Sequence, residues 1–238
     1  MKKSTNNATM KQPKMINMQL VKEIESLLRN RRSTENRFRF NLPTENAVAL
    51  LTASYKIEVE RRLRKFEFDE NTQSNLTRLA DYITAITPKF GVMLCGTCGN
   101  GKSTLMYAFQ QALNYLADKN HFDFMGNHFK PKMTIYDSYE LSQLARDIKE
   151  FTLIKNKPLL GIDDLGNEPV EILDFGNPIH PIIRLIEYRY INQSFTFITT
   201  NLTAKEIRTK YGDRIADRFN EMLHVIIFED GSYRKNKQ

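Results

Sequence analysis

Short apolar strands alternate with helices along the chain from residue 76 onward, and this alternation restricts the fold more than any other feature. Predicted strands cover 90–95, 133–137, 159–163, 195–199 and 224–228. Predicted helices cover 76–86, 102–117, 139–151, 179–191, 204–210 and 213–222. Short apolar strands that alternate with helices are typical of a parallel sheet with helices on both sides. The sequence therefore predicts an α/β fold.

Charge divides the chain differently. The 238 residues carry 35 lysines and arginines against 28 acidic residues, a formal net charge of +7. Residues 1–65 hold 15 of the basic and 6 of the acidic residues (net +9), which leaves 20 and 22 for residues 66–238 (net −2). Clustered positive charge favours nucleic acid or an acidic protein surface as partner, although a solvated basic helix also explains it. We expect a basic helical partner- or DNA-binding module over 1–65, a linker over 66–75 and the α/β domain over 76–238.

Two amphipathic helices are expected within the basic module, over residues 17–30 and 44–65. The second ends in a basic run made of Arg61, Arg62, Arg64 and Lys65. Positive charge there suits the negative end of a helix dipole as well as it suits a ligand. The sequence does not choose between the two explanations.

A glycine-rich segment joins the first predicted strand of the α/β domain to the helix after it. Residues 96–103 read G-T-C-G-N-G-K-S, the full phosphate-binding pattern in the required strand–helix context. Glycines let backbone N–H groups turn toward phosphate oxygens, and the helix N-terminus adds partial positive charge. Lys102 is expected to reach the β- and γ-phosphates, and Ser103 to offer its hydroxyl to Mg²⁺. The residues expected to contact nucleotide are Gly96, Thr97, Cys98, Gly99, Asn100, Gly101, Lys102, Ser103 and Thr104.

Polar residues follow two later strands. Asp163 and Asp164 directly follow the apolar residues 159–162. Asp163 would hold Mg²⁺, and Asp164 would polarise an attacking water. Asn201 follows the strand 195–199 and would orient that water or the γ-phosphate. The order of these motifs predicts that they meet on three neighbouring strands.

Arg214 and Arg218 lie four residues apart, on one face of a predicted helix. One explanation is a salt-bridged surface helix. The other is that one arginine reaches the γ-phosphate bound by a neighbouring subunit and stabilises the transition state.

Cysteine content and apolar runs exclude other classes. Two cysteines do not build a secreted disulfide scaffold, and the longest apolar runs, of about five residues, are far short of the roughly 20 that span a bilayer. A soluble, cytoplasmic protein without a membrane partner is therefore expected. Cys95 and Cys98 form a C-x-x-C pattern, but it overlaps the phosphate loop and no second pair completes a zinc site, so redox control is a minor alternative.

In their order along the chain, the motifs GTCGNGKST, LLGIDDLGNEP, FITTNL, YGDRIADRF and GSYR resemble those of DnaC/DnaI-type helicase loaders and IstB-type transposition helpers, both AAA+ ATPases. The resemblance implies an AAA+ P-loop core without a separate C-terminal lid domain. It implies an ATPase that uses ATP and Mg²⁺, acting as a homo-oligomer with ATP between subunits. By the same resemblance Asn201 is the sensor 1 residue, Arg218 rather than Arg214 the trans-acting arginine finger, and Arg234 a sensor 2-like arginine.

The resemblance also implies a role in DNA replication, in which the chain binds ATP and single-stranded DNA and loads a replicative helicase. Residues 139–151, with Arg146 and Lys149, resemble the part that lines the DNA path. A transposase is the alternative partner for the same ATPase. A small-molecule P-loop kinase and a non-hydrolysing nucleotide-gated scaffold are alternatives from other classes.

Two departures from the family pattern bear on the chemistry. Many AAA+ proteins carry Glu where this chain has Asp164, which predicts slow hydrolysis. Relatives with Asp-Asp carry a following Glu, so Glu168 is a reserve candidate for the catalytic base. The stretch 170–181 is longer than in compact members, and the sequence assigns it no role.

Overall fold

The computed structural model describes residues 17–31, 37–118 and 131–229, and it divides the chain into two compact units, 1–35 and 36–238. In the first unit the described element is helix α1 (Met18–Arg31). Its large apolar side chains are exposed, namely Met18, Leu20, Ile24 and Leu27. Within the described ranges, no helix has both the length and the apolar composition needed to cross a bilayer.

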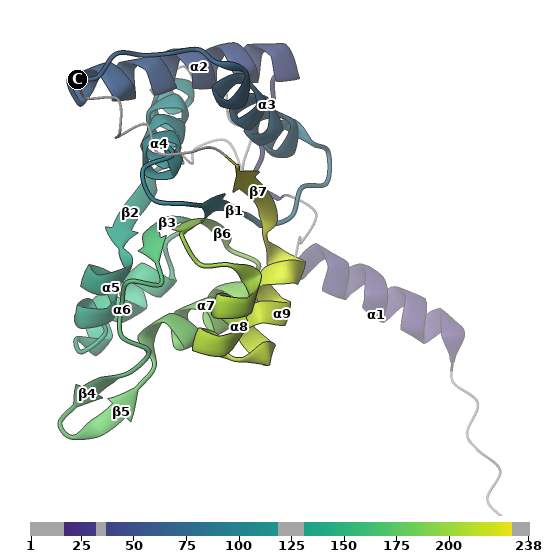
Figure 1. Ribbon diagram of the computed structural model, residues 1–238. Helices are drawn as coiled ribbons and strands as arrows, with labels where there is room; N and C mark the ends of the chain where they lie inside the picture. Colours follow the sequence, from purple (N-terminus) through teal and green to yellow (C-terminus); the bar gives the residue numbers. More distant parts are fainter. Residues whose placement is uncertain (1–16, 32–36, 119–130, 230–238) are drawn as a thin grey trace, which may run out of the picture. The chain divides into compact units, whose positions relative to one another are not determined.

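Five parallel strands form the sheet of the second unit, in the order β2–β3–β6–β1–β7 (Figure 1). They are β1 (Gly91–Gly96), β2 (Met133–Asp137), β3 (Leu159–Leu165), β6 (Phe195–Thr200) and β7 (His224–Phe228). All five predicted strands are present. The predicted α/β fold is confirmed.

Helices cover both faces of this sheet (Figure 1). On one face lie α2 (Thr44–Arg61), α3 (Glu70–Thr84) and α4 (Lys102–Asp118), and on the other α5 (Ser138–Leu144), α6 (Ile148–Lys155), α7 (Pro181–Ile191), α8 (Ala204–Tyr211) and α9 (Asp213–Met222). A hydrophobic core lies on each face of the sheet, and successive strand residues point to opposite cores. Val92 and Leu94 face the α4 side, and Met93 faces the α7 side. This alternation follows from the two-residue period of a strand.

Helix α2 belongs to the α/β unit and not to a separate module. Its buried stripe includes Leu51 and Tyr55, which pack in the core shared with α3 and α4. Phe38 and Phe40 are buried in the same core, where Phe40 stacks on Phe109 with ring centroids 5.4 Å apart. The boundary expected at residue 65 therefore lies between residues 35 and 36, because the aromatics of the basic stretch are core side chains.

The expected linker over 66–75 is also partly helical. Asp69 accepts a hydrogen bond from the Thr72 N–H and caps α3, which begins at Glu70. The end of the segment is buried, with Asn75 in the interior. Polar composition indicated a linker, whereas the cap shows the start of a helix.

The stretch 170–181 contains an antiparallel hairpin, β4 (Ile172–Asp174) and β5 (Asn177–Ile179). Two residues with positive φ, Phe175 at 47° and Gly176 at 84°, form its turn. Phe175 is fully exposed, while Ile172 at the root is buried in the core. The predicted helix 139–151 is likewise divided, into α5 and α6, because Asp147 caps a new helix.

Candidate nucleotide-binding site

The glycine-rich segment forms a tight loop between β1 and α4. Gly99 and Gly101 have φ values of 89° and 95°, a region that L side chains rarely adopt. A Cβ on Gly101 would lie 2.5 Å from the Tyr55 hydroxyl, so α2 packs directly on the loop. Asn100 is buried and its side-chain amide donates to the Phe228 carbonyl of β7 over 3.4 Å. The loop is therefore held from both sides.

Lys102 directs its ammonium back into this loop. It donates to the carbonyls of Gly96 (2.8 Å) and Thr97 (2.7 Å), to Asn100 Oδ1 (3.0 Å) and to Asn201 Oδ1 (2.8 Å). Burial lowers the pKa of Lys102, an effect that the charge of Asp164 opposes most strongly. The Lys102 ammonium is thus buried within the loop, where four oxygen acceptors surround it.

Ser103 and Asp163 meet beside Lys102. The Ser103 hydroxyl donates to Asp163 Oδ1 over 2.8 Å. Hydroxyl and carboxylate oxygens are ligands that Mg²⁺ accepts, and nucleotide sites commonly supply only one or two protein ligands beside phosphate and water. The pair therefore fits a magnesium ion. The described residues contain no larger group of His, Cys, Asp or Glu side chains able to hold a metal.

Thr199 is a site residue that the sequence reasoning missed. Its hydroxyl donates to Asp163 Oδ1 (2.5 Å) and accepts from the Asp164 backbone N–H (2.9 Å). It is fully buried on β6, between β3 and β1. The run 195–199 contains two threonines, Thr196 and Thr199, among apolar residues, and this was the available signal, because a buried hydroxyl needs a partner.

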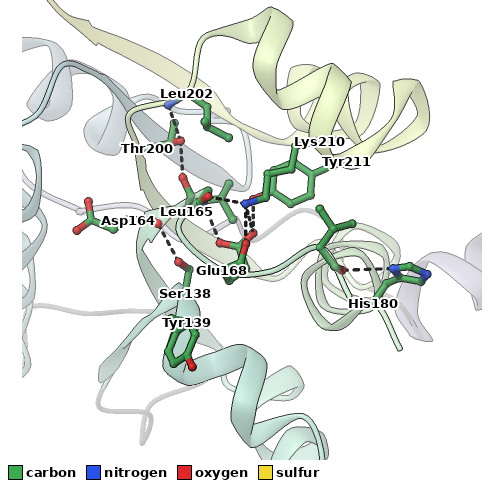
Figure 2. Close-up of polar contacts among 12 residues, drawn as sticks. Ser138, Tyr139, Asp164, Leu165, Glu168, His180, Thr200, Leu202, Lys210 and Tyr211 are labelled. Carbon is green, nitrogen blue, oxygen red and sulfur yellow. Dashed lines mark hydrogen bonds and ion pairs between the residues drawn. The ribbon is translucent and has the colours of Figure 1, made fainter. Parts of the chain in front are cut away.

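Asp164 takes a left-handed backbone conformation with φ of 53°, at an irregularity in the pairing of β3 with β6. Ser138 at the start of α5 donates to the Asp164 carbonyl over 2.8 Å. Left-handed conformations of non-glycine residues persist where the surroundings fix them, and they gather at functional sites. Figure 2 shows the Asp164 side chain directed away from Glu168.

Glu168 is not brought to the phosphate loop. Its carboxylate is buried, accepts from the Gly166 N–H (2.8 Å) and the Tyr211 hydroxyl, and pairs with Lys210 at 3.7 Å (Figure 2). Burial and this carboxylate raise the pKa of Tyr211, which keeps its proton. Glu168 therefore ties the chain after β3 to α8, and its geometry gives no support to the reserve role as base.

The two arginines of α9 differ in exposure. Arg218 lies 2.7 Å from Glu187 Oε1 of α7 and over the ring of Tyr190, with 13% of its side chain exposed. Arg214 lies 3.4 Å from the same oxygen, with 75% exposed. Among the described residues, the charged partner of both arginines is Glu187 of α7. Arg234 lies outside the described residues.

Thr104 and the two cysteines are the remaining residues at or beside the loop. The Thr104 hydroxyl accepts from Arg62 over 3.0 Å. Burial raises the pKa of Cys95 to about 11, which disfavours the thiolate needed for redox chemistry, and Cys98 is exposed. Neither cysteine is in a disulfide.

Comparison with known proteins supports this architecture. The chain matches no family model and no curated protein. It superposes on the crystal structure of the DnaC helicase loader with a TM-score of 0.51 and 22% identity, over 69% of this chain and 94% of that chain. The likeness to that structure is one of fold, an α/β domain built on a five-stranded parallel sheet.

Two other solved structures show weaker likeness. DnaI gives a TM-score of 0.48 at 21% identity, over 68% of this chain and 87% of that chain. The replication initiator DnaA bound to AMPPCP and single-stranded DNA gives 0.49 at 13% identity, over 70% and 49%.

Proposed function

We propose that the chain binds and hydrolyses ATP and uses the nucleotide state to load a replicative helicase onto single-stranded DNA. The observation that carries the ATP-binding part is the meeting of Lys102, Asn201 and the Ser103–Asp163 pair at one end of the sheet. Lys102 and Ser103 begin α4 after β1, Asp163 lies on β3, and Asn201 follows β6. The strands β3, β6 and β1 are neighbours in the sheet. The helicase-loading part is supported by the DnaC-like fold.

Each group has a part in the proposed reaction. Lys102 would leave the loop carbonyls for the β- and γ-phosphates, since phosphate oxygens are stronger acceptors than carbonyls. Ser103 and Asp163 would hold Mg²⁺, which neutralises phosphate charge. Asp164 would polarise the attacking water and Asn201 would orient it.

Arg218 is our candidate for the residue that acts on a neighbouring subunit. Its ion pair with Glu187 would position the guanidinium, or would be exchanged for the γ-phosphate, on assembly into a homo-oligomer. Arginine fingers contribute about 10³–10⁵ in rate in other ATPases and GTPases. We keep Arg234 as a candidate sensor 2-like contact.

ATP turnover with the full chain, with and without single-stranded DNA, tests the enzymatic part. Lys102→Ala should abolish ATP binding, and Asp164→Asn should keep binding but lose turnover. Arg218→Ala should also bind without turnover, and mixing it with Asp163→Ala should restore part of the activity. Arg208→Ala is the matched control, because Arg208 pairs only with Asp213 and Asp217 among the described residues.

Capture of partners with the full chain in the presence of ATP tests the loading part. Recovery of a replicative helicase supports the proposal, and recovery of a transposase instead would favour the transposition-helper alternative, for which the comparisons give no support. The DnaC-like fold supports the loader and gives no specific support to the small-molecule kinase. If the wild-type chain binds ATP but does not hydrolyse it, the non-hydrolysing nucleotide-gated scaffold would be the function that fits.

A further inference from the structure

The last turns of α2 lie on the phosphate loop and on the first turn of α4. Tyr55 reaches Gly101, and Arg62 Nη1 donates to the Thr104 hydroxyl over 3.0 Å. The Arg62 guanidinium also lies over the ring of Tyr107, 5.5 Å from its centroid. Arg62, which the sequence places in the basic run at the end of a helix, therefore contacts Thr104, the residue directly after Ser103.

A buried carboxylate fixes this arginine. Glu58 is 1% exposed, and a buried charge requires a partner of opposite charge. Arg61 meets Glu58 through Nε (3.0 Å) and Nη2 (2.8 Å), and Arg62 meets it through Nε (3.1 Å) and Nη2 (3.0 Å). Arg62 is therefore held at both ends, by Glu58 on α2 and by Thr104 on α4.

The two arginines share Glu58 but differ in exposure and in their further contacts. The Arg61 side chain is 64% exposed and turns toward solvent, whereas that of Arg62 is 33% exposed and continues to α4. Burial and the charge of Asp163, the proposed metal ligand, raise the pKa of Tyr107, whereas the charge of Arg62 lowers it. Through its hydrogen bond to Thr104, Arg62 places positive charge on the first turn of α4, next to Ser103.

We propose that Arg62 is a positioning residue for the nucleotide, which acts through Thr104 to hold the first turn of α4 and links α2 to nucleotide occupancy. The first-turn N–H groups of a helix bind phosphate, so their placement bears directly on affinity. By linkage, a nucleotide that strengthens the Arg62–Thr104 contact also stabilises α2. This inference rests on the proposed ATP site.

Nucleotide affinity tests the proposal, measured by calorimetric titration of the full chain with the non-hydrolysable analogue AMPPCP and Mg²⁺. Arg62→Ala should weaken binding roughly tenfold, since a charge-assisted hydrogen bond is lost while Glu58 keeps Arg61. Arg61→Ala, the matched control, should change affinity less than about twofold by the same reasoning. Thr104→Val should weaken binding as well, and adding it to Arg62→Ala should cost little more, because coupled residues are not additive.

Thermal unfolding with and without AMPPCP separates a positioning role from a structural one. Arg62→Ala should lower the nucleotide-induced rise in Tm, and Arg62→Lys should restore part of it. Wild-type affinity in Arg62→Ala, or equal losses in Arg61→Ala and Arg62→Ala, would overturn the inference. Failure of the wild-type chain to bind AMPPCP would instead overturn the proposed function.

Discussion

Two adjacent buried threonines at the end of β6 have different partners, and exchanging each for valine separates site chemistry from stability. Thr199 bonds to Asp163, whereas Thr200 donates to the Leu165 carbonyl over 2.6 Å. Thr200→Val leaves the buried Leu165 carbonyl short of a donor. Thr199→Val does the same to the half-buried Asp163 carboxylate and also removes the acceptor of the Asp164 N–H. Each loss costs about 1–3 kcal/mol of unfolding free energy. We expect Thr199→Val also to raise the Mg²⁺ concentration that half-saturates ATP turnover, because Asp163 loses its second hydroxyl.

Urea unfolding and a Mg²⁺ titration of ATP turnover measure the two effects. Thr200→Val should match Thr199→Val in unfolding free energy and the wild type in Mg²⁺ dependence. An equal Mg²⁺ shift in both variants would contradict a specific role for Thr199.

His224 supplies a pH-dependent contribution to stability. Burial, Lys89 and Arg78 lower its pKa below 6.5, and its ring stacks on Tyr82 at 5.0 Å. Protonation is therefore less favourable in the folded than in the unfolded chain, so folding stability falls as pH drops through 6.5 and below. In His224→Phe, which keeps an aromatic ring at the stack, we expect a smaller loss of unfolding free energy between pH 7.5 and 5. An unchanged loss would exclude His224 as its source.

At the scale of elements, the turn of the β4–β5 hairpin places an aromatic residue where asparagine is favoured. Both turn residues have positive φ, and Asn-Gly is the preferred pair for such hairpins. A non-glycine residue pays roughly 1–2 kcal/mol in this conformation, and asparagine less. We expect Phe175→Asn to raise the unfolding free energy by about 1 kcal/mol in urea titrations. Leu173→Asn, at an exposed strand position, should lower it slightly.

Which elements the sequence could predict depends on where their stabilising contacts lie. The strands were found because they are apolar on both faces, and the glycine loop because its pattern is local. The hairpin was missed because Phe175, Gly176 and Pro178 are typical of a loop. The residue types alone do not indicate that the two short strands pair with each other. The packing of α2 was missed because an amphipathic stripe that includes Leu51 and Tyr55 indicates that one face of the helix is buried. The stripe does not indicate which element covers that face.

The same reasoning applies to the site. Lys102, Ser103 and Asp163 follow from motif spacing, and the structure brings them together with Asn201. Arg62 and Thr199 contact the site from other elements, so the tertiary arrangement is needed to identify their partners. Glu168 was a candidate by its position after β3, yet its direction is set by Lys210 and Tyr211.

At the scale of the whole molecule, the boundary between the two units decides where the basic N-terminal region can be removed. Deleting residues 1–35 leaves the second unit complete. We expect that variant to fold and to bind ATP but to lose partner recruitment, if the basic module is confined to those residues. Circular dichroism, AMPPCP titration and partner capture measure these outcomes.

Deleting residues 1–65 should have a different result, because it removes Phe40, Leu51 and the rest of α2 from the core over α4. Losing a single large buried side chain costs about 2–5 kcal/mol, against a typical total stability of about 5–15 kcal/mol. The longer deletion therefore exceeds what the fold can tolerate, and it should yield unfolded or aggregated chain. A soluble, ATP-binding product would mean that α2 stabilises the fold less than its burial indicates. Loss of partner recruitment would then be attributable to residues 1–65 as one module, as the charge distribution alone suggests.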